Sequence, residues 1–451
     1  MTGEALNRKA RIIILVVAFL GWFLGGMQIG ITNLAMRPAA LGLMAEAGQL
    51  DGERFSELST IKKEALKGAT NPLGNEDAAM LDAWERAAGN WFAYFQCAFL
   101  FGAAAGGWLF GLLGDRIGRT RALALSIIWF SALTGLSTLS QSPMHLLLFR
   151  FLACFGVGGC WPNGVALVSE AWSKVARPVM ASLIGVAGNV GIAAIATLLA
   201  TPDYAVTPES WRWLLLVGGA PVLLGLGVLV FVRESPVWLA AKAHATSLSH
   251  PPAAPSVFRK PYLGVTIVGI ALATVPLFGG WGAANWMIPW AGEVGADTLP
   301  ATIGQVRSIT SIVGSLLAAV VAMAIGRRTC YFVSCLGALA AAQYAFWFTT
   351  PIGEDFLVWV ALSGLFNGIF FGWLPFFLPE LFETRVRATG AGVSFNFGRI
   401  LTASLIFLTP AVTAAFEGNY AHIGRVTSLV YIFGMIAIFF APDTSKRDMD
   451  K

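Results

Sequence analysis

The sequence predicts an all-α membrane protein with twelve transmembrane helices, arranged as two pseudo-symmetric six-helix bundles. Three observations predict this fold class: the composition, the succession of long apolar runs, and a repeat between the two halves of the chain. Of the 451 residues, 56% are hydrophobic and only 12% are charged, whereas soluble domains carry about 25% charged residues. This composition excludes an ordinary soluble protein.

Twelve apolar runs without acidic residues follow one another along the chain. A hydrocarbon core about 30 Å thick requires about 20 apolar residues per helix, and an open strand could not satisfy its backbone groups in lipid. The runs span residues 12–35, 91–113, 122–140, 144–169, 178–201, 212–232, 262–291, 301–325, 329–350, 356–378, 388–413 and 424–441. Breaks inside helices are expected at Pro162, at Pro276, Gly279, Gly280 and Pro289, and at Pro375.

The basic residues predict that both termini are cytoplasmic, in a bacterial inner membrane. With that orientation, 19 of the 30 Lys and Arg residues lie in cytoplasmic segments, as the positive-inside rule requires. These short loops explain the net charge of +5 without a nucleic-acid partner. The external stretch 36–90 carries six basic and nine acidic residues; a solvated spacer is the favoured interpretation, and a small folded cap is the alternative.

An internal repeat divides the chain. Glu170, Trp172 and Arg177 after the fourth run recur as Glu380, Phe382 and Arg387 after the tenth run, at an offset of 210 residues. The repeat predicts an N-terminal six-helix half (1–232), a cytoplasmic linker (233–261) and a C-terminal six-helix half (262–451). Repeated halves of this kind are typical of secondary transporters.

The loop between the second and third runs carries the most specific motif. Residues 111–121, GLLGDRIGRTR, resemble the G-x-x-x-D-R-x-G-R signature of the major facilitator superfamily. The resemblance implies a cytoplasmic gate that latches the carrier closed on the inside. Its predicted residues are Asp115, Arg116, Arg119, Glu170, Arg177, Glu380 and Arg387. In the second half Met323 and Ala324 replace the Asp and Arg, so the equivalent latch is expected to be weakened or absent.

Two further motifs point to one branch of this superfamily. Residues 378–390, LPELFETRVRATG, and Asn396 with Arg399 resemble the sialate:proton and metabolite:proton symporters; residues 233–239, RESPVWL, resemble the end of helix six in the sugar-porter and organic-ion branches. The symporter branch usually carries acids where this chain has Gly25, Gln28 and Cys160. None of the 25 acids lies in the middle of an apolar run, so co-transport of a proton or sodium does not follow from the resemblance.

Arg399 is the leading substrate-binding candidate because it lies about a dozen residues inside the eleventh run without an intramembrane acid to pair with. A guanidinium binds a carboxylate through two hydrogen bonds; the alternative is an arginine that caps backbone groups between helices ten and eleven. Arg150 and Arg307 lie nearer the outer helix ends, where snorkelling would suffice. The remaining candidates are the amides and indoles of Asn396, Gln28, Gln96, Trp161, Asn163, Asn189, Trp281, Asn285 and Trp373.

The sequence does not favour an enzyme. The four histidines lie in or near loops, and no cluster of His, Cys and Asp forms within a run, so neither a metal nor a cofactor is expected. We expect a monomeric carrier, surrounded by membrane lipids, that moves a small organic solute by alternating access. An organic anion (a monocarboxylate, sialate or aromatic acid) is favoured; the alternatives are a neutral sugar and a nutrient sensor that does not transport.

Overall fold

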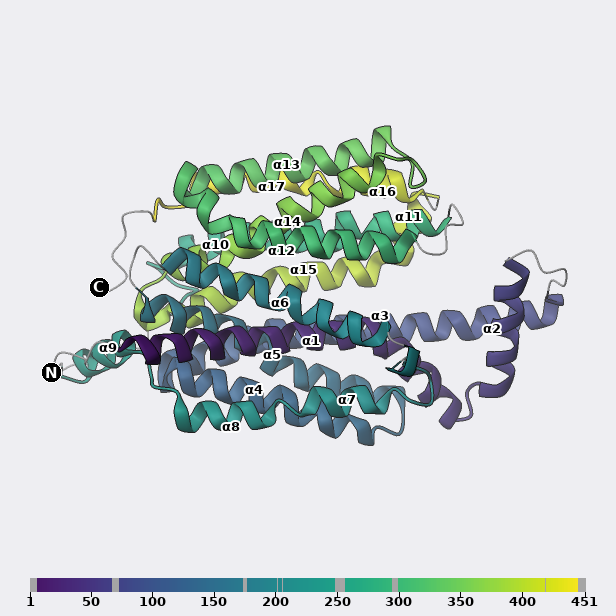
Figure 1. Cartoon of the computed structure of the whole chain (residues 1–451), viewed down its shortest axis with the longest axis horizontal. Helices are drawn as coiled ribbons and strands as arrows, with labels where there is room; N and C mark the ends of the chain where they lie inside the picture. Colours follow the sequence, from purple (N-terminus) through teal and green to yellow (C-terminus); the bar gives the residue numbers. More distant parts are fainter. Residues whose placement is uncertain are drawn as a thin grey trace.

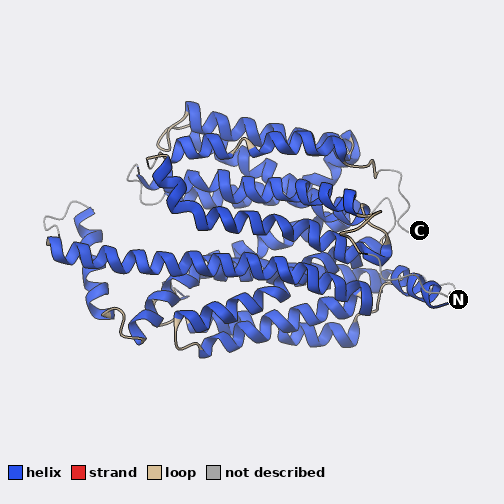
Figure 2. Cartoon of the chain, turned by 180° about the vertical axis from the view of Figure 1, so that it is seen from behind, coloured by secondary structure: helices blue, strands red, loops and turns tan. Residues whose placement is uncertain are grey.

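The computed structural model describes residues 6–66, 73–172, 177–200, 202–204, 206–247, 256–293, 299–417 and 419–444, and this part of the chain is helical, without strands (Figure 2). Eleven of its helical segments are long and apolar enough to cross a membrane. The remaining crossing is the seventh along the chain, and it is interrupted after Phe278 by a π-turn, Gly279–Ala283, and a 3-10 turn, Ala284–Trp286. The predicted break in this helix is therefore confirmed, whereas the helices Pro143–Ala171 and Phe356–Glu380 continue through Pro162 and Pro375 without one.

The twelve crossings are formed by the following helices: α1 (Arg8–Glu46), α3 (Asn75–Ile117), α4 (Arg119–Leu136), α5 (Pro143–Ala171), α6 (Arg177–Ala200), α7 (Arg212–Gly219) with α8 (Val222–Phe231), α10 (Leu263–Phe278) with α11 (Met287–Glu293), α12 (Leu299–Ile325), α13 (Arg327–Phe348), α14 (Phe356–Glu380), α15 (Arg387–Ala415), and α16 (Tyr420–Thr427) with α17 (Val430–Ala437). Two further helices, α2 (Gly52–Leu66) and α9 (Pro236–Ser247), lie outside the bundle.

The two halves are built alike. In the first half α3 packs on α5, α1 on α6, and α4 on α7 and α8; in the second half α12 packs on α14, α10 on α15, and α13 on α16 and α17. Figure 1 shows the two bundles side by side, with both chain ends at the same end of the molecule. We call this the terminal end; an even number of crossings explains why the N- and C-termini meet there.

The halves meet mainly where α15 packs against α3 and α5, and where α12 and α14 pack against α6. Two glycines of α3 permit the close approach of α15. A Cβ on Gly107 would lie 2.1 Å from Nδ2 of Asn396, and one on Gly111 would lie 2.8 Å from the carbonyl oxygen of Ala388. Small residues of this kind let membrane helices come into backbone contact.

The stretch 36–90 is not a solvated spacer over its described residues. Helix α1 continues to Glu46, α2 follows, and α3 begins at Asn75, so that α2 and the ends of α1 and α3 extend beyond the bundle at the end opposite the termini (Figure 1). The rings of Phe55 and Trp84 pack 6.3 Å apart, and Lys62 pairs with Glu85 at 2.9 Å. The hydrogen bond to Glu85 raises the pKa of Lys62. Apolar side chains at helical spacing hold this segment folded.

Candidate functional site

The turn between α3 and α4 is fixed by a carboxylate from the linker. Gly118 adopts a φ of +113°, and Glu234 accepts hydrogen bonds from the backbone amides of Arg119 (2.9 Å) and Thr120 (3.1 Å) at the start of α4. An anion at a helix N-terminus satisfies unpaired amides and interacts favourably with the helix dipole. A Cβ on Gly118 would lie 2.1 Å from the Glu234 carboxylate, so the turn requires glycine.

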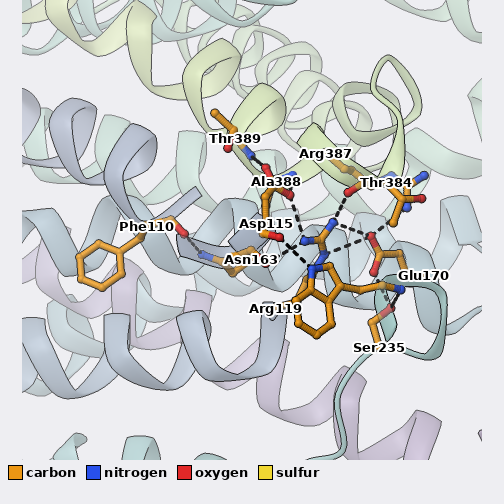
Figure 3. Close-up of polar contacts among 12 residues, drawn as sticks. Phe110, Asp115, Arg119, Asn163, Glu170, Ser235, Thr384, Arg387, Ala388 and Thr389 are labelled. Atoms are coloured by element: carbon orange, nitrogen blue, oxygen red, sulfur yellow. Dashed lines mark hydrogen bonds and ion pairs between the residues drawn. The ribbon is translucent and has the colours of Figure 1, made fainter. Parts of the chain in front are cut away.

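Arg119 lies at the centre of the buried network that follows this turn (Figure 3). Its side chain is fully buried and forms ion pairs with Asp115 at 2.9 Å and Glu170 at 3.2 Å. It also donates hydrogen bonds to the carbonyl oxygens of Gly114 (2.7 Å) and Thr384. Since Thr384 belongs to the second half of the chain, Arg119 bridges the two bundles.

Two more contacts bridge the bundles beside Arg119 (Figure 3). Asp115 accepts hydrogen bonds from the backbone amides of Ala388 (3.2 Å) and Thr389 (2.8 Å), in the first turn of α15. Arg387 donates to Glu170 at 2.8 Å. We call Asp115, Arg119, Glu170 and Arg387 the latch. Its bonds are charge-assisted and buried, and they join the two halves at the terminal end of the interface in this structure.

The other three predicted gate residues lie around the latch. Arg116 is exposed in the last turn of α3. Arg177 is buried and donates to the carbonyl oxygen of Ser169 at 2.8 Å. Glu380 forms an ion pair with Arg327 at 2.8 Å and accepts a hydrogen bond from Thr444, two residues of the second half.

The second half thus retains one part of the motif. The Arg327–Glu380 pair stands where the first half has Arg119 and Glu170, whereas Met323, which replaces the aspartate, is 48% exposed. The weakening predicted for the equivalent latch of the second half is therefore limited to the contacts that an aspartate would make. The role of Glu234 as a helix cap was not predicted, although residues 233–239, RESPVWL, contain it.

Arg399 of α15 lies at the interface between the halves and is 3% exposed. Its guanidinium is 5.9 Å from the ring centre of Trp22, 5.6 Å from that of Phe99 and 5.3 Å from that of Phe395. Within the described residues its Nη1 atom has no hydrogen-bond partner. Aromatic faces attract a cation but cannot accept the hydrogen bonds that a guanidinium offers. Two of these rings come from α1 and α3, in the other half of the chain.

The side chains next to Arg399 on α15 also contact the first half. Phe395 stacks on Trp161 with ring centres 4.0 Å apart and planes 12° apart. Asn396 donates to the carbonyl oxygens of Gly392 (3.0 Å) and Gly158 (3.4 Å). Trp161 therefore supports a wall of the Arg399 site, and Asn396 connects two helices.

Arg150 does not snorkel. It is fully buried in the first half, where it donates to the Gln28 side chain at 3.0 Å and to the Thr32 hydroxyl at 2.7 Å. Gln28 also accepts from Thr134 at 3.2 Å and donates to the carbonyl oxygen of Gly218 at 3.1 Å. The snorkelling prediction failed because position along a helix does not show which way a side chain points. Gln28 is therefore a hydrogen-bond partner of Arg150.

Most of the remaining predicted amides form hydrogen bonds between helices. Asn163 donates to the carbonyl oxygens of Phe110 and Gly159 at 3.0 and 2.9 Å. Gln96 donates to Asn33 of α1 at 2.8 Å.

Five further candidates lie in the second half or contact it. Asn189 of α6 donates to Ser311 of α12 at 3.3 Å, and Trp373 donates to the carbonyl oxygen of Arg327 at 3.1 Å. The side chains of Trp281 and Asn285 lie outside the described part of the structure. Arg307 is half-buried on α12.

Two six-helix halves joined face to face, with an ion-paired latch at one end and a buried cation between them, define a membrane carrier. The chain belongs to the Major Facilitator Superfamily, whose family model matches residues 80–405. It is therefore an integral membrane transporter of small solutes and not an enzyme.

Among curated relatives, the chain is 28% identical to the cis,cis-muconate transport protein of Acinetobacter baylyi, over 76% of this chain and 83% of the relative. It is 26% identical to a sialic acid transporter of Escherichia coli, over 65% and 71%. A solved proton:xylose symporter superposes with a TM-score of 0.71 at 17% identity, covering 99% of this chain and 98% of that one. The human organic anion transporter MFSD10 gives 0.66 at 16% identity, covering 96% and 100%. These structures share the fold.

Proposed function

We propose that this transporter carries a small organic anion, such as a monocarboxylate, sialate or aromatic acid, by alternating access. The observation that carries the proposal is the Arg399 site. A charge in the middle of a bilayer costs about 2.5–3.5 kcal/mol on insertion scales, and Arg399 is surrounded by aromatic rings, with one nitrogen lacking a hydrogen-bond partner. A substrate carboxylate would supply both the charge and the acceptor.

The surroundings of Arg399 suit such a ligand. The faces of Trp22, Phe99 and Phe395 offer apolar surface for a ring or an unsaturated chain, and interfaces between repeats are where secondary transporters bind their substrates. The relatives named for muconate and sialic acid transport support an organic acid. The proposal includes no coupling ion, because no acid lies in the middle of an apolar run.

The latch is proposed as the gate of the cytoplasmic side. The basic residues of the short loops support a cytoplasmic position for the terminal end, and we propose that the protein acts as a monomer in a bacterial inner membrane. Opening to the cytoplasm would separate Asp115 from α15 and Glu170 from Arg387. The structure with its latch closed would then be the state that does not release substrate to the cytoplasm.

Uptake into proteoliposomes tests the substrate class. Labelled aromatic acids, sialate and monocarboxylates are compared with neutral sugars, with and without imposed pH and sodium gradients. Losing a hydrogen bond to a charged group costs about 1.5–3 kcal/mol, so Arg399→Gln should lower anion uptake about 10- to 150-fold, and Arg399→Lys should lower it less. Arg121→Gln, which removes an exposed arginine from the terminal end, is the matched control.

Three outcomes would contradict the proposal. Wild-type uptake by Arg399→Gln would remove the role of this arginine. Uptake of sugars but not of acids would identify a neutral sugar carrier. Binding of an acid without uptake would indicate a sensor.

A further inference from the structure

A basic cavity of about 190 Å³ opens at the terminal end, beside the latch. Its lining includes three cations from three segments: Arg116 from α3, Lys242 from α9, and Arg385 from the turn before α15. Asp115 is the acid in this lining, and its charge is already bound by Arg119 and by two backbone amides. The lining therefore contains more cationic than acidic side chains, and the cavity volume is roughly six times the ~30 Å³ that a water molecule occupies.

An apolar groove of about 240 Å³ lies between the same two helices, α3 and α15. Its lining is aromatic and aliphatic: Phe101, Ala105 and Trp108 from α3, and Val393, Phe397 and Ile400 from α15. Three of these side chains are exposed on the outer surface of the bundle: Phe101, Trp108 and Phe397. In a membrane protein, this surface faces the hydrocarbon.

The cavity and the groove follow one seam. Along α3 the groove residues Phe101, Ala105 and Trp108 are followed by the cavity residues Leu112 and Asp115, at steps of three or four residues that keep one helix face. Along α15 the cavity residue Thr389 is followed by the groove residues at steps of four, four and three.

The length of this seam matches one leaflet of a bilayer. Ten residues separate Ala105 from Asp115, about 15 Å of helix and half of a hydrocarbon core about 30 Å thick. The seam thus offers positive charge at the depth of one headgroup layer and an apolar channel through the leaflet beneath it.

We propose that this seam binds one anionic phospholipid, with its phosphate in the basic cavity and an acyl chain in the groove. Three cations around one neutralised acid select a negative headgroup. Lys242 lies 4.7 Å from the ring centre of Trp238, and Trp238 donates to the carbonyl oxygen of Asp115, so an indole borders the headgroup site, as is usual at membrane interfaces. The adjoining groove distinguishes a lipid from free phosphate.

The position of the seam gives the lipid a conformational effect. Both cavities are lined by α3 of the first half and by residues of the second half, and segments of the linker complete them: α9 in the basic cavity and Phe258 in the groove. A lipid that fills them binds the closed latch better than any state in which α3 and α15 separate. Its binding therefore shifts the population toward the closed state. This consequence rests on the alternating access proposed above, whereas the lipid site itself does not.

Lipid retention tests the site directly. The whole protein is reconstituted with phosphatidylglycerol or phosphatidylcholine, and bound lipid is counted by native mass spectrometry. Each Lys or Arg near an anionic headgroup contributes about fivefold in affinity, so Lys242→Gln/Arg385→Gln should bind phosphatidylglycerol about 30-fold more weakly. The control Arg8→Gln/Lys9→Gln removes two exposed cations from the same end of the molecule and should retain the lipid.

A second variant separates lipid from free phosphate. Ala105→Trp fills the groove and leaves the cations in place, so it should lose the lipid. Equal retention of phosphatidylglycerol and phosphatidylcholine by the wild type, or full retention by Lys242→Gln/Arg385→Gln, would refute the site. Failure of inorganic phosphate to displace the bound lipid would support the site. Retention unchanged in Ala105→Trp would refute the acyl-chain part.

The conformational effect is measured by the distance between spin labels on Leu125→Cys in α4 and Val333→Cys in α13, one in each half. Phosphatidylglycerol should raise the short-distance, closed population in the wild type but not in Ala105→Trp. An unchanged distance distribution, with lipid retained, would refute the conformational effect alone. Failure of the anion uptake assay would leave the lipid retention result standing.

Discussion

Replacing Glu170 by glutamine should open the latch by a predictable amount. The Glu170 carboxylate is fully buried and accepts from Arg119 at 3.2 Å, from Arg387 at 2.8 Å and from Ser235. Arg119 lies in the same half as Glu170, so that pair is lost in both conformations and does not bias the equilibrium. The bond to Arg387 exists only when the halves meet. A hydrogen bond to a charged group contributes about 1.5–3 kcal/mol, and we therefore expect the ratio of closed to open molecules to fall about 10- to 150-fold.

Spin labels at Leu125→Cys and Val333→Cys measure this ratio, since each position is exposed and lies six residues after the start of α4 or α13. The five native cysteines are buried and should not take up label. Glu46→Gln is the control, because Glu46 pairs with Arg212 at 2.7 Å inside the first half. It should lower thermal stability with little change in the distance distribution. Equal shifts in the two variants, or none in Glu170→Gln, would refute the assignment of the latch.

Two other substitutions test single contacts. Gly118→Ala and Gly326→Ala both place a side chain at positive φ, which costs about 1–3 kcal/mol. Only at Gly118 would the new Cβ also collide with Glu234, so the melting temperature of Gly118→Ala should fall further than that of Gly326→Ala. Equal melting temperatures would show that the Glu234 cap does not constrain the turn. Gln28→Leu removes the amide oxygen that lies 3.0 Å from Arg150. Leaving a buried charged group with one hydrogen-bond partner fewer costs about 1–3 kcal/mol, so the melting temperature should fall relative to wild type; an unchanged melting temperature would contradict this reasoning.

The number and order of the membrane crossings followed from the sequence because each run had to satisfy the thickness of the bilayer. The first two membrane-crossing helices are longer than their apolar runs: α1 continues to Glu46 and α3 begins at Asn75. Hydropathy locates the part of a helix that lies in lipid, but it does not register the amphipathic turns beyond it. Those turns are stabilised by packing of Phe55 on Trp84 and by ion pairs, which depend on segments that are distant in the sequence.

The latch was predicted in its members but not in its pairings. Spacing identified Asp115 and Arg119, and the repeat identified Glu170 and Arg387. The structure pairs Glu170 of one repeat with Arg387 of the other. A repeat found within one chain shows which residues are equivalent, whereas the contact between the halves joins residues that are not equivalent. The aromatic neighbours of Arg399 were missed for the same reason, since they converge only when three helices pack together.

Two buried arginines are stabilised in different ways, and the difference bears on transport. Two nitrogens of Arg150 donate to neutral oxygens of Gln28 and Thr32, and its Nε atom has no hydrogen-bond partner among the described residues. Arg399 is held by aromatic faces and keeps one nitrogen without a hydrogen-bond partner among the described residues. The hydrogen bond that Arg399 lacks in the empty site can form only when a substrate binds. An anionic substrate would therefore stabilise the interface between the halves most strongly at Arg399, where contacts from both halves converge.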